Sequence, residues 1–267
     1  MGRISQRFEE LRASGGNRGK ALIPFVTAGD PDLGFTKDLI FRLEEMGADL
    51  LELGVPFSDP MADGPTIQRS SFRSLKAGIS LRAVLRFVEE IRKDVRLPLV
   101  LMTYYNPIFA MGEGKFVDEG VRAGVDGVIV PDLPFEEAGS LTELTEGKPL
   151  DLISMPAPTS TPRRRAMYCA NARGFIYYVA QLGVTGARER LAEDLKDGLD
   201  AIRALTQVPV AAGFGIKTPE QAHQVSQYCD GVIVGSALID TIDSQTDREA
   251  KLRAAGEFVQ SIKKAIG

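Results

Sequence analysis

The chain has 267 residues, of which 44% are hydrophobic and 25% are charged, and its formal net charge is −4. This acidic balance argues against nucleic acid or an anionic membrane surface as a partner, because both attract basic proteins. Cys169 and Cys229 are too few for a disulfide framework, and no apolar run approaches the roughly 18 residues of a membrane span. We therefore expect a cytoplasmic protein that does not cross a membrane.

The N-terminus predicts a short amphipathic helix, because Ile4, Phe8 and Leu11 recur on one side and Gly15-Gly16 can end it. It lacks the apolar core of a signal peptide. Eight apolar runs of strand length then follow, at 21–26, 51–55, 97–102, 127–131, 150–155, 174–180, 208–214 and 231–237. Most of their residues are β-branched or aromatic and both faces are apolar, as a covered parallel sheet requires.

Helical patterns separate these runs. The inward residues expected of three helices are Leu39, Leu43 and Met46; Leu81, Val84, Val88 and Ile91; and Leu252, Ala255, Phe258 and Ile262. Gly47 is placed to end the first helix, and Ser80 is placed to cap the second. Thr218, Pro219 and Gln221 have the spacing of a capping box at the start of another helix.

Eight strands alternating with helices over about 250 residues predict a (β/α)8 TIM barrel with an extra N-terminal helix. The main alternative, a doubly wound open sheet, favours a GxGxxG turn after the first strand, where this chain has TAGDPD at 27–32. The length also suits two modest domains. No Pro-, Gly- or Ser-rich linker divides the chain, so we expect residues 1–267 to form one catalytic domain.

A carboxylate, Glu52, interrupts the apolar run at 51–55. Strand alternation puts it on one face with Leu50, while Leu51 and Leu53 share the other face. If the leucines meet the helices, Glu52 points into the barrel near the C-terminal strand ends, where barrel active sites lie. Burial raises the pKa of a lone carboxylate, which suits a group that gives and accepts a proton. A structural glutamate bonded to a hydroxyl is the alternative.

A second carboxylate, Asp63, lies in the following loop, FSDPMADGPTIQ at 57–68. Asp59-Pro60 and Asp63-Gly64-Pro65 are turn-forming sequences, so each aspartate can serve its own turn alone, and the residues by themselves favour that role. The length of the loop is nonetheless typical of lids and catalytic loops.

Glycine-containing turns follow the last three predicted strands, at 183–187, 213–216 and 234–237. Glycine lets backbone N–H groups approach an anion, and a helix N-terminus adds a favourable dipole. Because barrels often bind phosphate after strands seven and eight, Gly213, Gly235 and Ser236 are candidates for a phosphate site. Tight turns alone also explain each glycine. The first of these turns is expected to close over the site.

Missing residue types narrow the chemistry further. The only histidine, His223, falls in a helical pattern, which argues against Ser-His-Asp or Cys-His catalysis. No Cys and His cluster has metal-ligand spacing, so no metal site is expected. No lysine lies in the apolar body of a predicted strand, which argues against a Schiff-base aldolase. Carboxylates, hydroxyls and a phosphate cradle favour acid–base chemistry on a phosphorylated small molecule.

Seven segments in chain order carry a family pattern. They are PFVTAGDPD (24–32), LELGVPFSDPMADGPTIQ (51–68), TYYNPI (103–108), PDLPFEE (131–137), APTSTP (157–162), FIYYV with GVTGAR (175–188), and PVAAGFGIKTPEQ (209–221). Over nearly the whole chain they resemble the tryptophan synthase alpha subunit. The resemblance implies a TIM barrel that cleaves indole-3-glycerol phosphate to indole and glyceraldehyde 3-phosphate.

The resemblance also implies roles for individual residues. It makes Glu52 and Asp63 the catalytic pair, with Glu52 transferring a proton at indole C3 and Asp63 holding the indole N–H, and it makes Tyr177 the active-site tyrosine. The other implied residues are Gly186, Gly213, Gly235 and Ser236 at the phosphate, Phe25, Ile129 and Phe214 as walls of the indole pocket, and Thr185 in the lid. The three wall residues can equally be ordinary core.

A partner follows from the same resemblance: an α2β2 complex with a PLP-dependent beta subunit, which receives indole through a tunnel. PLP would belong to the partner, so no cofactor is expected in this chain. The residues implied at the interface are Asp59, Pro60, Asn106 and Pro134, although Asn106 can instead cap its turn. Ala180, Leu182 and Pro156 depart from the family pattern, and the first two can change lid closure and coupling to the beta subunit.

Three alternatives remain open at this point. Another phosphate-binding barrel lyase or isomerase, such as an indole-glycerol-phosphate synthase, would need a catalytic lysine at a strand end. A non-catalytic barrel that only activates a beta subunit is disfavoured by the presence of both Glu52 and Asp63. A stand-alone indole-producing lyase is not distinguished by the sequence.

Overall fold

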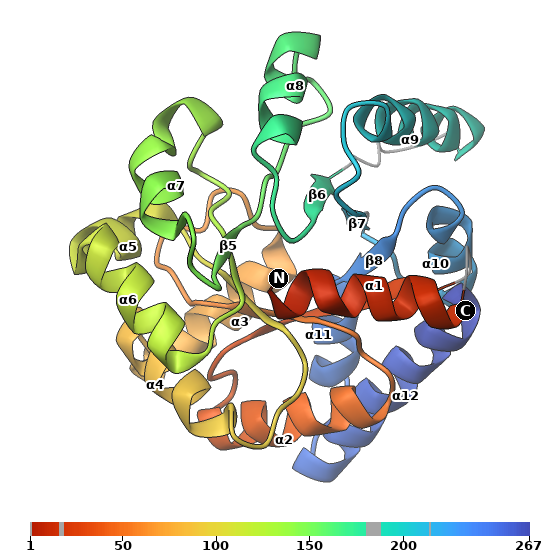
Figure 1. Cartoon of the computed structure of the whole chain (residues 1–267). Helices are drawn as coiled ribbons and strands as arrows, with labels where there is room; N and C mark the ends of the chain where they lie inside the picture. The colour runs from red at the N-terminus through yellow and green to blue at the C-terminus, as the bar shows by residue number, and fades with distance from the viewer. Residues whose placement is uncertain (1, 16–18, 180–187, 214) are drawn as a thin grey trace.

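Helices surround a curved sheet of parallel strands in the computed structural model, which describes residues 2–15, 19–179, 188–213 and 215–267 (Figure 1). The strands are β1 (Ala21–Thr27), β2 (Leu51–Gly54), β3 (Leu99–Met102), β4 (Gly127–Ile129), β5 (Asp151–Leu152), β6 (Ile176–Val179), β7 (Val210–Gly213) and β8 (Gly231–Val234). The helices are α1 (Arg3–Gly15), α2 (Leu33–Glu45), α3 (Pro65–Lys76), α4 (Leu81–Ile91), α5 (Tyr105–Met111), α6 (Glu113–Ala123), α7 (Gly139–Thr145), α8 (Pro162–Ala170), α9 (Arg188–Arg203), α10 (Pro219–Ser226), α11 (Ser236–Asp243) and α12 (Arg248–Ile266), with a 3-10 turn η2 (Phe135–Glu137).

The strand order is β5-β4-β3-β2-β1-β8-β7-β6, and every pairing is parallel. A single bridge between Ser154 and Ile176 closes the sheet between its edge strands β5 and β6. There Tyr177 N donates to Ser154 O at 2.9 Å. All eight predicted runs contain an observed strand, so the predicted (β/α)8 barrel is confirmed. Within the described residues, no helix is both long and apolar enough to cross a bilayer.

The helix ends confirm most of the predicted caps. Ser80 and Thr218 accept N–H bonds at the starts of α4 and α10, and Gly47 follows α2 with a positive φ of 97°. The capping box is wrong in one detail, because Gln221 Oε1 accepts from Lys217 N rather than from the cap residue itself.

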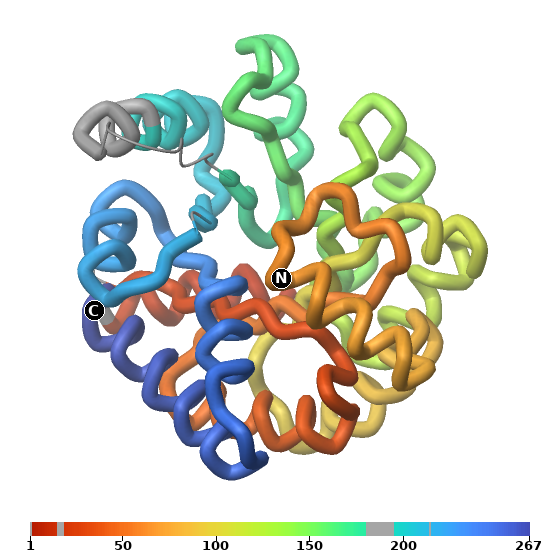
Figure 2. Tube along the Cα trace, turned by 180° about the vertical axis from the view of Figure 1, so that it is seen from behind, coloured from red at the N-terminus to blue at the C-terminus, as the bar shows by residue number. Residues whose placement is uncertain are grey.

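The core has two layers, one on each face of the sheet. Leu51 and Leu53 lie in the layer between strands and helices, while Leu50 lies in the barrel interior. The predicted N-terminal helix, α1, crosses the N-terminal end of the barrel in Figure 1 and buries Ile4 and Phe8 in the interior layer. Its apolar side therefore closes this end. Figure 2 shows the opposite end, where the strands finish.

Ion pairs fix α1 in this position. Arg3 Nη1 lies 2.9 Å from Asp126 Oδ1, and Arg7 Nη2 lies 2.6 Å from Asp49 Oδ1. Both aspartates are buried and also accept a strand N–H, from Leu99 and Leu22 respectively. Helix α1 thus covers the barrel interior at its N-terminal end, and the C-terminal strand ends remain open toward the loops that follow them.

Candidate active site

Glu52 lies on β2 with its side chain in the barrel interior. Its backbone register pairs it with Phe25 on β1 and Val100 on β3. The side chain has no exposed area, and neither carboxyl oxygen has a hydrogen-bond partner among the described residues. Burial therefore raises the pKa of Glu52 well above its ordinary value. The direction predicted from strand alternation is confirmed, and the described residues do not supply the hydroxyl partner that a structural role would need.

Asp63 lies in the loop between β2 and α3. Its N–H completes a turn with Pro60 O at 3.1 Å, but its carboxylate accepts a bond from Tyr104 Oη at 3.1 Å. Burial raises the pKa of Asp63 to about 6, and the bond from Tyr104 opposes that rise. A purely local turn role, which the residues alone favoured, is therefore wrong for the side chain, because its partner lies on another strand's loop.

Tyr104 was not predicted as a site residue, although the TYYNPI segment contains it. It is buried, and its Oη also accepts the Ala62 N–H at 2.9 Å. Its ring stacks on Phe57 with centroids 5.0 Å apart, and Phe57 N donates to Ser71 Oγ at 3.0 Å. One tyrosine thus holds the loop backbone and the Asp63 carboxylate together.

Tyr177 comes from β6 on the far side of the barrel. Its pKa is raised well above its ordinary value, first by burial and then by the nearby carboxyl groups of Glu52 and Asp63. A Cβ built on Gly213 would lie 2.8 Å from Tyr177 Oη, so this glycine leaves room for the phenol. The structure therefore brings Glu52, Asp63 and Tyr177 together, and it gives Gly213 a packing role beside its predicted phosphate role.

A cavity of about 900 Å³ opens at this end of the barrel and is lined by Asp63, Met102 and Tyr177 among others. Phe25 lines a small neighbouring space of about 10 Å³ with Asp63. Ile129 belongs to the interior core rather than to either lining. The remaining predicted residues Phe214, Gly186 and Thr185, and the departures Ala180 and Leu182, lie outside the described residues.

The turn between β8 and α11 has the features of an anion cradle. Gly235 caps α11 without a side-chain bond, and the first helical bond runs from Ile239 N to Gly235 O at 3.1 Å. The N–H groups of Ser236 and the next two residues therefore lack acceptors within the helix. Such a helix start favours phosphate.

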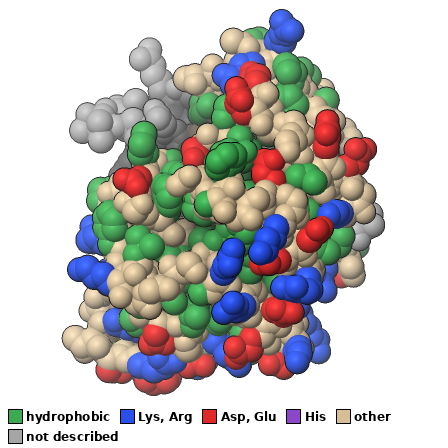
Figure 3. Space-filling model, turned by 90° about the vertical axis from the view of Figure 1, so that its left-hand side faces the viewer, with side chains coloured by type: hydrophobic (Ala, Val, Ile, Leu, Met, Phe, Trp, Pro, Cys, Tyr) green, Lys and Arg blue, Asp and Glu red, His purple; other side chains and the backbone are tan. Residues whose placement is uncertain are grey.

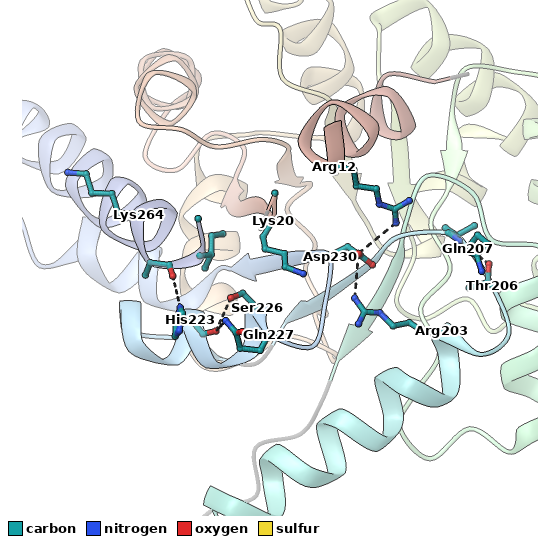
Figure 4. Close-up of a pocket in the computed structure, with 15 residues that line it drawn as sticks. Arg12, Lys20, Arg203, Thr206, Gln207, His223, Ser226, Gln227, Asp230 and Lys264 are labelled. Atoms are coloured by element: carbon teal, nitrogen blue, oxygen red, sulfur yellow. Dashed lines mark hydrogen bonds and ion pairs between the residues drawn. The ribbon is translucent and has the colours of Figure 1, made fainter. Parts of the chain in front are cut away.

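A larger cavity, of about 1060 Å³, lies at the other end of the barrel (Figure 4). Arg12 and Arg203 reach Asp230 Oδ1 there, at 3.7 and 3.4 Å. Lys20 Nζ donates to a backbone carbonyl at 2.8 Å, and His223 is exposed on α10 as predicted. These groups form ion pairs and hydrogen bonds within the chain. The carboxyl groups of Glu52 and Asp63 lie at the opposite end of the barrel.

A family model described as tryptophan synthase alpha chain matches residues 10–267. The chain belongs to the tryptophan synthase alpha chain family. It is 49% identical to the tryptophan synthase alpha chain of Geobacter sp. (strain M21) over 266 residues, covering 100% of this chain and 98% of that one. With the corresponding chain of Geobacter sulfurreducens the identity is 48%, with 100% of both chains covered.

Solved structures of this family share the fold. The tryptophan synthase alpha subunit of Legionella pneumophila str. Paris superposes with a TM-score of 0.90 at 40% identity, covering 100% of this chain and 98% of that chain. A chain of tryptophan synthase from M. tuberculosis superposes with a TM-score of 0.88 at 33% identity and covers 100% of this chain and 99% of that chain. The resemblance noted in the sequence is therefore confirmed.

Membership in the tryptophan synthase alpha chain family confirms the predicted reaction class. The family's enzymes are lyases of tryptophan biosynthesis, and their alpha reaction cleaves indole-3-glycerol phosphate. The family also implies a beta subunit as partner.

Proposed function

We propose that Glu52 and Asp63 divide the proton transfers that cleave indole-3-glycerol phosphate. The observation that carries this proposal is the pairing of a fully buried Glu52, without hydrogen-bond partners among the described residues, with an Asp63 whose pKa is about 6. The first environment favours the neutral acid, and the second leaves a carboxylate ionised at neutral pH.

In the proposed reaction, the Glu52 acid protonates indole C3. The ring nitrogen then becomes cationic and its N–H more acidic, and Asp63 accepts a hydrogen bond from it. The side-chain hydroxyl next loses its proton to the Glu52 carboxylate while the bond between C3 and the side chain breaks. Its electrons restore the indole, and the hydroxyl carbon becomes the aldehyde of glyceraldehyde 3-phosphate. Tyr177, beside both carboxyl groups, completes the proposed site.

The phosphate would lie at Gly235 and Ser236, at the start of α11, with Gly213 and Gly186 at neighbouring turns. Phe25, Ile129 and Phe214 are the proposed walls around the indole ring, and Thr185 is the proposed lid residue. Phe25 has the strongest support among the walls, because it is the register partner of Glu52 and lies beside Asp63. We propose that residues 1–267 form one catalytic domain without a cofactor of its own.

The proposed partner surface lies around the Asp59 loop and α5. Asp59, Asn106 and Pro134 are exposed, and Asn106 lies inside α5 rather than at its cap, whereas Pro60 is buried within this chain. Two large apolar side chains add to this surface, since Met61 is 91% exposed and Phe109 is 67% exposed. Figure 3 views the side of α5 to α7, where hydrophobic side chains interrupt a surface of mixed charge.

Such apolar anchors suit a protein partner. We propose that a PLP-containing beta subunit binds here in an α2β2 complex in the cytoplasm and receives indole through a tunnel.

Indole release from indole-3-glycerol phosphate by the purified chain tests this function. The Glu52→Gln and Asp63→Asn variants are each expected to lose about 10²- to 10⁴-fold in kcat, since each positioned proton donor or acceptor contributes that much. Addition of a beta subunit should raise the activity of the unaltered chain. Near-normal turnover in either variant would contradict the assignment. An inactive chain that still activates a beta subunit would support the non-catalytic alternative, and full activity without coupling would support a stand-alone lyase.

A further inference from the structure

A strip of polar contacts joins α3 to α11. The first of these helices starts two residues after Asp63, and the second starts directly after Gly235. The strip therefore connects the helix behind the proposed catalytic aspartate with the helix that carries the proposed phosphate cradle. In Figure 2 the two helices, orange and blue, lie on either side of the red segment that follows β1.

Arg73 is the centre of this strip. Its Nε donates to Asp30 Oδ1 at 2.7 Å, and its Nη2 donates to Asp30 Oδ2 at 2.6 Å. The same Nη2 donates to Asp243 Oδ1 at 2.9 Å. One guanidinium on α3 thus holds a carboxylate of the segment after β1 and a carboxylate at the end of α11.

Other residues of α3 support the same arrangement. Ser70 donates to Asp30, and Ser74 Oγ donates to Ala28 O at 2.5 Å. Toward α11, Thr66 Oγ1 donates to Asp240 Oδ1 at 3.0 Å. Thr66, Ser70, Arg73 and Ser74 are spaced three or four positions apart, so they share one face of α3.

Burial separates the strong contact from the weak ones. The Asp30 side chain is only 11% exposed and accepts a bidentate guanidinium, the strongest geometry for such a pair. Arg69 and Asp240, at 3.4 Å, are both more than half exposed, and surface pairs of this kind contribute little. Of the two ion pairs that join α3 to α11 among the described residues, Arg73–Asp243 is the shorter and less exposed, and the same guanidinium is anchored by Asp30.

We propose that Arg73 is a positioning residue for the cleavage reaction, fixing the separation between Asp63 and the phosphate cradle at Gly235 and Ser236. The inference rests on the proposed function of those residues. The substrate has its indole ring at one end and its phosphate at the other, so both groups must be held at matching distances. A displacement of about 1 Å can cost about 10²-fold in rate.

The two halves of the substrate provide the test. In Arg73→Met, kcat/KM for indole-3-glycerol phosphate should fall about 10- to 100-fold. Inorganic phosphate, sn-glycerol 3-phosphate and indole should each inhibit or bind as they do in the unaltered chain, because each occupies one end only. Asp243→Asn, which removes the α11 partner and leaves Asp30, should show the same pattern with a smaller loss. Arg82→Met, exposed on α4, is the matched control.

Normal kcat/KM in both the Arg73 and Asp243 variants would overturn the proposal. Weakened binding of each separate half would also overturn it, because that result reports a damaged site rather than a wrong separation. Circular dichroism and thermal unfolding check that each variant is folded. If Arg73→Met does not fold, Asp243→Asn still tests the proposal. If the unaltered chain and the Arg82 variant released no indole, the proposed function itself would fail.

Discussion

Replacing Tyr104 by phenylalanine should raise the pKa of Asp63 and shift the pH dependence of cleavage. The substitution removes only the hydroxyl, which donates to Asp63 Oδ2 at 3.1 Å and accepts the Ala62 N–H at 2.9 Å. The ring keeps its stacking on Phe57. Asp63 then loses the hydrogen bond that lowers its pKa, while the burial that raises it remains.

The size of the shift follows from the energy of that bond. A hydrogen bond to a charged group contributes about 1.5–3 kcal/mol, and partial solvent access to Asp63 favours the lower value. Since one pKa unit corresponds to about 1.4 kcal/mol, the pKa of Asp63 should rise by about one unit, from about 6 toward about 7. If the reaction needs ionised Asp63, activity should fall about fivefold at pH 6 and hardly at all at pH 8.

The assay is kcat/KM for indole release between pH 5 and 9, which reports groups of the free enzyme. Tyr105→Phe is the matched control, because its hydroxyl instead donates to Glu113 Oε1 at 3.0 Å, away from Asp63. An unshifted acidic limb in Tyr104→Phe would refute the reasoning. A loss of equal size at every pH would refute it too, since that pattern reports misplacement rather than a changed pKa.

Three further outcomes are expected. Burial raises the pKa of Glu52 in the folded state, so the folded state loses stability as pH rises above the unfolded-state pKa of about 4.3. Urea unfolding should therefore show that Glu52→Gln gains stability relative to the unaltered chain between pH 5 and 8. A difference in the free energy of unfolding that stays constant over this pH range would contradict the prediction. Gly213→Ala places a Cβ 2.8 Å from Tyr177 Oη, so kcat should fall about tenfold while the free energy of unfolding changes by less than about 3 kcal/mol. The control Gly139→Ala, which has open space at its Cβ, should change neither kcat nor the free energy of unfolding. Phe109→Ser should weaken binding to a beta subunit at least about fivefold in a titration, without changing the activity of the isolated chain.

Local rules predicted the elements of the barrel and the direction of Glu52. Strand alternation repeats every two residues, so Leu50, Leu51 and Leu53 were enough to place the glutamate in the interior. The caps at Ser80 and Thr218 depend on residues three positions apart and were predicted for the same reason. Features determined within a few residues can be predicted from the sequence.

Contacts between distant segments could not be predicted in this way. Tyr104 and Asp63 are 41 positions apart and meet only because β2 and β3 are neighbours whose following loops lie side by side. The packing of Gly213 against Tyr177 likewise depends on the register of β6 and β7. Turn propensity described the backbone of Asp63 correctly, but its side chain follows the tertiary contact.

One physical cause, burial, acts on both carboxyl groups, but their partners make the outcome different. Glu52 has no hydrogen-bond donor among the described residues to stabilise its charge, so its pKa stays well above its ordinary value. Asp63 has the Tyr104 hydroxyl, which limits the rise to about 6. Burial thus favours the protonated form of Glu52, while a pKa of about 6 leaves most of Asp63 ionised at neutral pH, and this difference supports the proposed acid and base roles. The Tyr104 hydroxyl therefore maintains the pKa difference on which the proposed roles depend, and its loss should bring the pKa values of the two carboxyl groups closer before it changes the fold.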